Sequence, residues 1–274
     1  ESKIEKAISR KTKGIFLANI LGQSCNFENI LKICNKHNLI LMVDNCESFL
    51  STHKGKISAK FGVFSTLSSF FSHHFSTIEG GYLLTDDFEI YCLALSLRSH
   101  GWIREQPPNS KLLKGKYSDF ERSYKFVLPG YNLRPNEISA TLGLEQIKKD
   151  KKFVKSRREN AKFFYRIFDK STAYDLQKYD KGSSFFAFAI ILNKNIRNKV
   201  LLKLKQALIE TRPIVSGNII HNKMIKYSNF RISEKVTNAE IIDKKGFMIG
   251  NRSFPFTNIE KKALINLKNL IESF

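Results

Sequence analysis

The chain has 274 residues, 42% of them hydrophobic, and a formal net charge of +21. This length is sufficient for one large or two modest domains with real cores. No apolar run approaches the ~20 residues that a membrane-spanning helix needs, and no signal peptide opens the sequence. The four cysteines are scattered without Cys-x-x-Cys spacing. This usage favours neither a zinc site nor a disulfide framework and predicts a cytoplasmic protein with no membrane partner.

The positive charge raises the question of a nucleic-acid partner. The lysines are spread along helices, on faces that alternate with apolar positions. Lysine, asparagine and isoleucine are all abundant, which is the composition that an AT-rich genome produces. We therefore expect no nucleic-acid partner.

The first half of the chain predicts a parallel sheet with helical crossovers. A strand beginning at Gly14 is followed by a helix that Asn26 caps and that runs to Asn38. A strand at residues 39–43 comes next, so the opening is a strand–helix–strand unit. Two further strands are predicted at residues 61–67 and 82–85, and then a helix starts at Asp86-Asp87 and reaches Leu97. The stretch from 103 to 125, rich in proline, lysine and glycine, predicts a long surface loop.

The second half predicts a smaller α+β domain. A very long basic helix is expected from about Pro135 to about Phe168, and such a helix commonly links two domains. Beyond it, strands and helices alternate. The expected strands lie at 185–192, 213–215 and 246–249, and the expected helices lie at 196–210 and from 258 onward. We expect one domain at residues 1–146 and a second, including the long helix, at residues 147–274.

Polar side chains follow two of the apolar strands. The run Asp44-Asn45-Cys46-Glu47-Ser48 follows the strand at 39–43, and the run SSFFSHHFSTIEGG (68–81) follows the strand at 61–67. Polar side chains at the ends of buried strands in an α/β protein usually face a ligand crevice. The alternative is a loop with solvated hydroxyls and one histidine bonded to a backbone carbonyl.

Several motifs in order resemble those of a known family. VDNCES, SSFFSHH…EGG, RSHGWIR, FVLPGYNLRP and ETRPIVSGN together resemble the DegT/DnrJ/EryC1/StrS family of vitamin B6-dependent sugar aminotransferases and dehydratases. The resemblance implies an α/β protein with the aspartate-aminotransferase-like (fold type I) fold and a small C-terminal domain. It begins about a third of the way into the family's chain, so we expect an N-terminally truncated fold. The missing part carries the turn whose helix N-terminus would hold the cofactor phosphate.

The resemblance implies pyridoxal 5'-phosphate (PLP) and its pyridoxamine form (PMP) as cofactors. By this resemblance Asp44 would pair with the cofactor's ring nitrogen, Ser68 would contact its phosphate, and Glu47 would lie near its ring. Asn132 would reach the phosphate held by a neighbouring subunit, which implies a homodimer. Attraction of a phosphate cofactor and an anionic nucleotide-sugar would then use the net positive charge.

His73 stands where the family's aminotransferases carry a lysine, and the dehydratase branch has histidine there. Imidazole cannot bond covalently to the cofactor as lysine does, but it can take or give a proton near neutral pH. By resemblance, His73 would transfer the proton in a half-reaction with an amino donor, expected to be L-glutamate, and again during loss of the sugar's C3 hydroxyl. His74 should point the other way along an extended backbone.

The resemblance therefore predicts a 3-dehydratase for a nucleotide-diphosphate-linked 4-keto-6-deoxyhexose, in deoxysugar and O-antigen lipopolysaccharide biosynthesis. For four further residues a substrate or carboxylate contact and a structural role are equally compatible with the sequence: His100, Arg104, Arg212 and Asn218. Two other functions stay open. One is a nucleotide-sugar 4-aminotransferase, against which the missing lysine argues. The other is a non-catalytic fragment or partner subunit that keeps the fold and the dimer surface.

Overall fold

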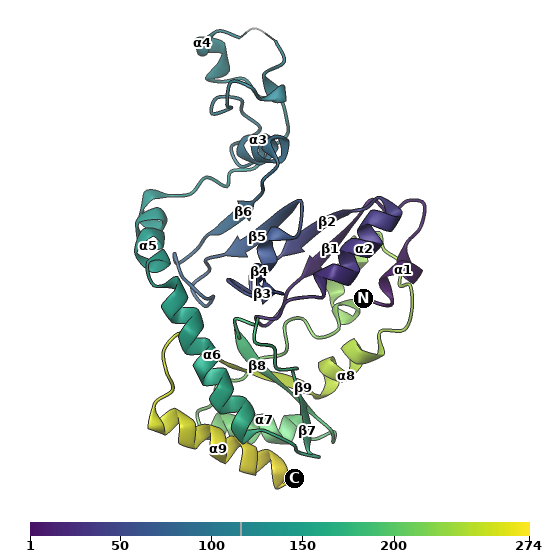
Figure 1. Ribbon diagram of the computed structural model, residues 1–274, viewed down its shortest axis with the longest axis vertical. Coiled ribbons are helices and arrows are strands. Elements are labelled where there is room, and N and C mark those ends of the chain that lie inside the picture. Colours follow the sequence, from purple (N-terminus) through teal and green to yellow (C-terminus); the bar gives the residue numbers. More distant parts are fainter. Residues whose placement is uncertain (116) are drawn as a thin grey trace.

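The computed structural model describes residues 1–115 and 117–274. Lys116, in the expected loop at 103–125, lies outside the described residues. The molecule is elongated (Figure 1), with a small C-terminal domain at one end, a sheet in the middle and an arm at the other end. Among the described helices, none combines the length and the apolar composition needed to cross a bilayer.

The sheet in the middle of the molecule has four strands in the order β1-β2-β5-β6. The first three run parallel, whereas β6 runs antiparallel to β5. Ala18 pairs with Asp44, and Asp44 pairs with Thr66, so the carboxyl ends of the parallel strands meet at one edge. The strands are β1 Gly14–Ala18, β2 Ile40–Asp44, β5 Phe64–Ser68 and β6 Gly81–Leu84.

Helix α2 (Phe27–His37) connects β1 and β2, which confirms the expected strand–helix–strand opening. The Asn26 side chain accepts a hydrogen bond from the Asn29 amide and caps the helix, and Asn38 ends it in the left-handed conformation. The apolar face of α2 is buried against β2. Two short helices and one hairpin complete this region: α1 Ile4–Ala7, η1 Ser58–Lys60 and the hairpin of β3 Thr52–His53 with β4 Lys56–Ile57.

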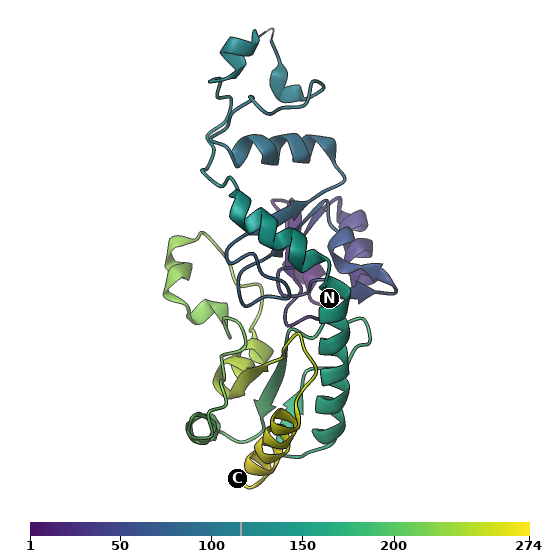
Figure 2. The ribbon, with the colours of Figure 1, turned by 90° about the vertical axis from the view of Figure 1, so that its left-hand side faces the viewer.

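Residues 88–147 form the arm: α3 and the segment with α4 extend beyond β6, and α5 returns to lie beside the sheet (Figures 1 and 2). Two of its segments pair through isolated bridges, Ser99 with Asn132 and Trp102 with Phe126. The expected loop at 103–125 contains two short helices, and a capping box of Ser118 and Glu121 begins the second. The helices of the arm are α3 Phe88–Leu97, η2 Lys111–Leu113, α4 Asp119–Arg122 and α5 Glu137–Ile147.

The expectation of one continuous helix from 135 to 168 is wrong. The segment forms two helices, α5 and α6 (Asp150–Ile167). Between them the Lys149 amide bonds to the Gln146 carbonyl, three residues back, and this tightened turn ends α5. Helix α5 buries no residue, whereas α6 buries one whole face. The bend therefore lets the chain leave the arm and pack on the small domain.

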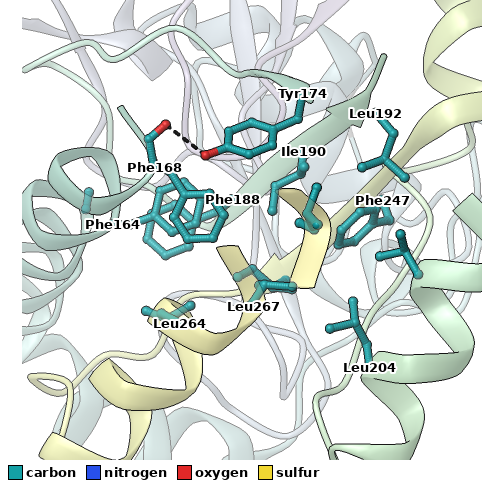
Figure 3. Close-up of a cluster of buried hydrophobic side chains, with 14 of the residues drawn as sticks. Phe164, Phe168, Tyr174, Phe188, Ile190, Leu192, Leu204, Phe247, Leu264 and Leu267 are labelled. Atoms are coloured by element: carbon teal, nitrogen blue, oxygen red, sulfur yellow. Dashed lines mark hydrogen bonds between the residues drawn. The ribbon is translucent and has the colours of Figure 1, made fainter. Parts of the chain in front are cut away.

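The small domain is built on an antiparallel sheet of β7 Tyr174–Leu176, β8 Ala187–Leu192 and β9 Gly246–Gly250, in that order. Its core contains a stack of aromatic rings from α6 and β8 (Figure 3). Phe164 stacks on Phe188 with ring centroids 4.1 Å apart and on Phe168 at 4.4 Å. The other helices of the domain are α7 Arg197–Gln206, η3 Ile219–His221, η4 Lys223–Tyr227, α8 Thr237–Lys245 and α9 Asn258–Glu272.

The strand expected at 213–215 does not form. Arg212 makes a single bridge with Met248 on β9, and the chain then turns away from the sheet at Val215, whose φ is +49°. A β-branched residue in the left-handed region cannot continue an extended strand. The other strands and helices expected in this half are present, with ends displaced by a few residues.

Candidate active site

Asp44, Glu47, Ser68 and His73 lie at the carboxyl ends of β2 and β5 or in the loops that follow these strands. Asp44 is half-buried, and its Oδ1 accepts hydrogen bonds from the Cys46 amide (3.0 Å) and the Thr66 hydroxyl (3.2 Å). Among the described residues its Oδ2 accepts no hydrogen bond. The carboxylate is thus fixed through one oxygen and offers the other to a ligand.

Sequence reasoning missed Thr66. The register pairs it with Asp44 across β2 and β5, and its hydroxyl holds the carboxylate in place. A hydroxyl side chain two residues before the predicted Ser68, on a strand parallel to that of Asp44, was a signal that could have identified it.

Glu47 has a structural role that the sequence did not indicate. Its Oε2 accepts a hydrogen bond from the Leu21 amide at 2.9 Å, so it holds the loop that follows β1. Burial raises the pKa of Glu47, and the negative charge of Asp44 adds to this effect, while the hydrogen bond from Leu21 opposes it. Its expected place near a cofactor ring stays a prediction.

Ser68 and the loop after it form a tight turn that presents His73. The Ser68 hydroxyl oxygen accepts a hydrogen bond from the Phe70 amide at 3.1 Å, which leaves its proton available for donation. The His73 amide in turn bonds to the Phe70 carbonyl at 2.9 Å. The buried Ser69 and Thr77 hydroxyls, 2.6 Å apart, hold the two ends of the loop together.

The His73 ring is half-buried between two aromatic side chains. It meets Phe70 edge-to-face, with ring centroids 5.8 Å apart, and Phe186 in the same way at 5.3 Å. Burial lowers the pKa of His73, and the negative charge of Asp44 opposes this shift. Its Nδ1 is buried without a hydrogen-bond partner among the described residues. A buried nitrogen without a partner is costly, and the Nδ1 of His74 is unpaired as well; the partial exposure of the His73 ring makes it the more accessible of the two.

His74 differs from His73 in burial, although both rings pack on Phe186 and the backbone here is a turn, not the extended chain that was expected. It is 2% exposed, and its Nε2 lies 3.4 Å from the Ser184 carbonyl oxygen. Burial lowers the pKa of His74 well below its ordinary value. It therefore serves as an uncharged interior residue, and of the two adjacent histidines only His73 is placed for acid–base chemistry.

Three predicted residues lie in the arm. Asn132 is exposed and pairs through its main chain with Ser99. His100 follows Ser99 with a φ of +61°, and its amide bonds to the Tyr131 carbonyl at 2.8 Å. The Arg104 guanidinium lies over the Trp102 ring at 5.7 Å. These contacts are within the arm, so the structure brings the three residues near one another and places them apart from the four at the strand ends.

Two predicted residues lie in the small domain. The exposed Arg212 side chain pairs with Glu210, its Nη2 lying 2.7 Å from Oε1. Asn218 is buried, and its side chain donates to Glu240 at 3.2 Å and accepts from the Ile220 amide. Both side chains thus have structural partners, and the substrate contacts expected for them stay predictions.

The mainly parallel sheet with polar residues at its strand ends, followed by a small α+β domain, matches the PLP-dependent aminotransferase fold. Solved structures that share this fold include an aminotransferase of Helicobacter pylori, with 23% identity and a TM-score of 0.84. The model of the DegT/DnrJ/EryC1/StrS aminotransferase family matches residues 1–253, and the chain belongs to this family.

Within the family, the chain is similar to GDP-4-keto-6-deoxy-D-mannose 3-dehydratases. It is 43% identical over 253 residues to that of Escherichia coli O55:H7, covering 90% of this chain and 65% of the relative. It is 42% identical over 270 residues to that of Yersinia pseudotuberculosis, covering 97% and 68%. The chain thus spans about two thirds of the length of these relatives.

Two solved structures of such dehydratases each match with 40% identity and a TM-score of 0.92, over 98% of this chain and 70% of theirs. One is the E. coli enzyme with bound hydrated PLP. The other contains a trapped PLP–glutamate geminal diamine. The comparisons therefore agree on the branch of the family that His73 indicated.

Proposed function

We propose that this chain carries the acid–base site of a PLP/PMP-dependent 3-dehydratase. The proposed substrate is GDP-4-keto-6-deoxy-D-mannose and the proposed amino donor is L-glutamate. The observation that carries the proposal is His73: a half-buried imidazole with an unpaired buried Nδ1, beside Asp44, in a chain 43% identical to a 3-dehydratase. The aminotransferase alternative requires a lysine at this position, and none is present.

The residues at the strand ends fit the cofactor. Asp44 offers an unoccupied carboxylate oxygen that can accept the proton of a pyridinium nitrogen. The Ser68 hydroxyl has a proton free to donate to a phosphate oxygen. The unpaired His73 Nδ1 is matched by the polar groups that the cofactor and the sugar would bring.

Each side chain then has a defined role. The bound cofactor supplies the electron-accepting ring that makes loss of the sugar's C3 hydroxyl possible. Asp44 holds the ring nitrogen protonated and fixes the orientation of the ring. His73, whose pKa burial lowers, is neutral at neutral pH and accepts a proton from the carbon next to the cofactor's nitrogen. It returns a proton when the cofactor is regenerated with glutamate.

We further propose that the protein works as a homodimer, with the arm at the subunit interface and Asn132 completing the partner's site. The support is the apolar surface of the arm, on which Tyr131 is 65%, Leu133 67% and Ile138 71% exposed. Contiguous exposed apolar side chains usually mark an interaction surface. A domain boundary near residue 147, a cytoplasmic location and a role in deoxysugar and O-antigen lipopolysaccharide biosynthesis belong to the same proposal.

The test is a product assay on the protein at the full length that its gene encodes. With GDP-4-keto-6-deoxy-D-mannose, PLP and L-glutamate, we expect a sugar in which hydrogen replaces the C3 hydroxyl. One 2-oxoglutarate and one ammonia should form with each sugar, because glutamate provides the two electrons. Omission of glutamate and the Asp44→Asn variant are the controls. A 4-amino-sugar would instead indicate an aminotransferase, and an unchanged sugar would indicate a non-catalytic protein.

The variant His73→Lys tests the placement of His73. A lysine amine can bond covalently to the cofactor aldehyde, so borohydride should fix the cofactor to the variant and not to the wild type. Dehydration should fall by about 100-fold or more, the usual contribution of a positioned acid–base group, and some 4-amino-sugar should appear. His73→Asn, which loses the base but gains no amine, is the matched control. Dehydration at the wild-type rate without a covalent adduct would show that His73 is not next to the cofactor.

A further inference from the structure

Arg157, on α6, is a buried cation near the candidate site. Neither the sequence analysis nor the proposed mechanism assigns it a role. It is 4% exposed. In the described part of the chain its side chain donates to two carbonyl oxygens, that of Phe186 at 3.0 Å and that of Asn251. Its Nε is buried without a partner. The guanidinium is thus held by main-chain dipoles, with no carboxylate among its hydrogen-bond partners.

A buried charge without a counter-ion is expensive, and burial lowers the pKa of Arg157 to about 10. A neutral side chain of similar shape would avoid much of this cost. The packing around Arg157 shows which residues its charge can affect. Its guanidinium carbon lies 5.8 Å from the centre of the Phe186 ring.

The Phe186 ring connects Arg157 to His73. The same ring meets His73 edge-to-face, with centroids 5.3 Å apart and an interplanar angle of 79°. The main chain of Phe186 is fixed by the hydrogen bond from Arg157 to its carbonyl. Arg157 therefore both orients the residue on which His73 packs and places a positive charge within the same low-dielectric region.

We propose that Arg157 is a positioning residue for His73. Its buried positive charge acts together with burial to keep the imidazole neutral and able to accept a proton, and its hydrogen bond to Phe186 fixes the residue against which the imidazole packs. The role in catalysis rests on the proposed function, whereas the electrostatic coupling between the two side chains does not.

The charges that face His73 act in opposite directions. Asp44, at the end of β2, raises the pKa of His73, while Arg157, on α6, lowers it. The neighbouring His74 is held uncharged by burial and also by Arg157. Burial is the largest cause that lowers the pKa of His73, and Arg157 adds to it, so without the arginine burial alone would oppose the carboxylate of Asp44. A protonated His73 could not serve as a base, so the arginine offsets the residue that binds the cofactor ring.

The test is a pH titration of the histidine rings by NMR, on the protein without cofactor, with His73→Asn to assign the His73 signal. Arg157→Met removes the charge and keeps a long side chain, and the titration of His73 should move to higher pH. Arg157→Lys keeps the charge, and the titration should stay near that of the wild type. Arg158→Met is the matched control, because Arg158 is the next residue on α6 and bonds to the Ser183 and Leu50 carbonyls.

A purely structural role for Arg157 would lower the melting temperature of both Arg157 variants and leave the His73 titration unchanged, which would overturn the proposal. An equal shift in the Met and Lys variants would also overturn it. If Arg157→Met does not fold, Arg157→Lys still decides: titration near the wild-type pH supports the proposal and a clear upward shift contradicts it. The acid limb of the dehydratase pH profile should move with the NMR titration. A shift by NMR in a protein without dehydratase activity would contradict the proposed function and leave the coupling intact.

Discussion

The two ends of the molecule differ in how they bury their apolar residues. In the small domain, Phe164, Phe188 and Leu192 are fully buried, and the central strand β8 is buried along nearly its whole length. At the edge of the sheet that leads into the arm, all residues of β6 are exposed, and α5 buries none. The small domain thus carries its own core, whereas β6 and the arm leave large apolar side chains exposed.

The candidate site lies between these two regions: some of its residues are fixed and partly buried, and one lies on the exposed arm. Asp44 is fixed by hydrogen bonds, and His73 is fixed by a main-chain hydrogen bond and by packing on Phe186, which directly precedes β8 of the small domain. Asn132, by contrast, lies on the exposed arm. Asp44 and His73 are therefore fixed within one chain, whereas the phosphate contact predicted for Asn132 depends on the surface that the arm meets.

The largest expected effect is on the stability of the small domain. Phe164→Ala removes the ring at the centre of the aromatic stack and should lower the free energy of unfolding by about 3–5 kcal/mol. Tyr131→Ala, on the arm, is the matched control and should change the stability of the isolated chain by no more than about 0.5 kcal/mol. Urea unfolding followed by circular dichroism measures both. Equal losses for the two variants would show that the arm is as tightly packed as the small domain.

The second prediction concerns Asn132 on the exposed arm. Asn132→Ala and Asp44→Asn should each lower the activity of the full-length protein by about 10-fold or more, because a hydrogen bond to a charged group contributes about 1.5–3 kcal/mol. If Asn132 acts across the interface, a hybrid dimer of the two variants has one intact site. Random mixing should then restore about one quarter of the wild-type activity.

The two unmixed variants, carried through the same dissociation and reassociation, are the controls for this experiment. Activity in the mixture that never exceeds that of the better parent would show that Asn132 acts within its own subunit. The result would also remove the main reason for placing the arm at a subunit interface.

The smallest expected effect is at the rim of the small domain, where His221 lies between two carboxylates. Its Nδ1 is 2.8 Å from Asp243 Oδ2 and its Nε2 is 3.2 Å from Glu240 Oε2. The hydrogen bond from His221 lowers the pKa of Asp243. Because the folded pKa is lower than the unfolded one, the contribution to stability is present above about pH 4 and is lost as the pH falls through the folded value.

Since the cluster is exposed, His221→Ala should lower the melting temperature by no more than about 2 °C at about pH 6. The difference from the wild type should shrink as the pH is lowered toward about 3. Melting curves at several pH values provide the measurement. A difference that stays constant over this range would mean that the ion pairs do not contribute and that the histidine acts through packing alone.

Local patterns in the sequence were sufficient for much of the fold and for part of the site. The strands that precede Asp44 and Ser68 are short apolar runs, and the Asn26 cap with the apolar period that follows it identifies α2. In each case the signal lies within a few residues of the feature that it predicts. The expected extended backbone at His73 and His74 does not form: the segment is a turn, both rings pack on Phe186, and the two histidines differ in burial.

Features that depend on distant contacts could not be predicted in this way. The break between α5 and α6 follows from where the small domain offers a surface, and no proline or glycine marks it. The role of Arg157 depends on Phe186, which is 29 residues away in the chain, and on the loop that carries His73. Nothing in the basic pattern of α6 distinguishes this arginine from Arg158 next to it.

The segment from Gly182 to Phe186 has a consequence for how the protein folds. The Ser183 hydroxyl donates to the Gly22 carbonyl, 161 residues away in the chain. A Cβ at Gly22 would lie 2.3 Å from the Phe185 nitrogen, so the main chains of these two segments are in direct contact. At ordinary rates of synthesis, residues 22 and 183 leave the ribosome roughly 8–30 s apart. Because the contact joins residues so far apart in the chain, we expect it to form late and slowly during folding. Until residues 182–186 are synthesised, the strand ends of the nascent sheet stay exposed to solvent.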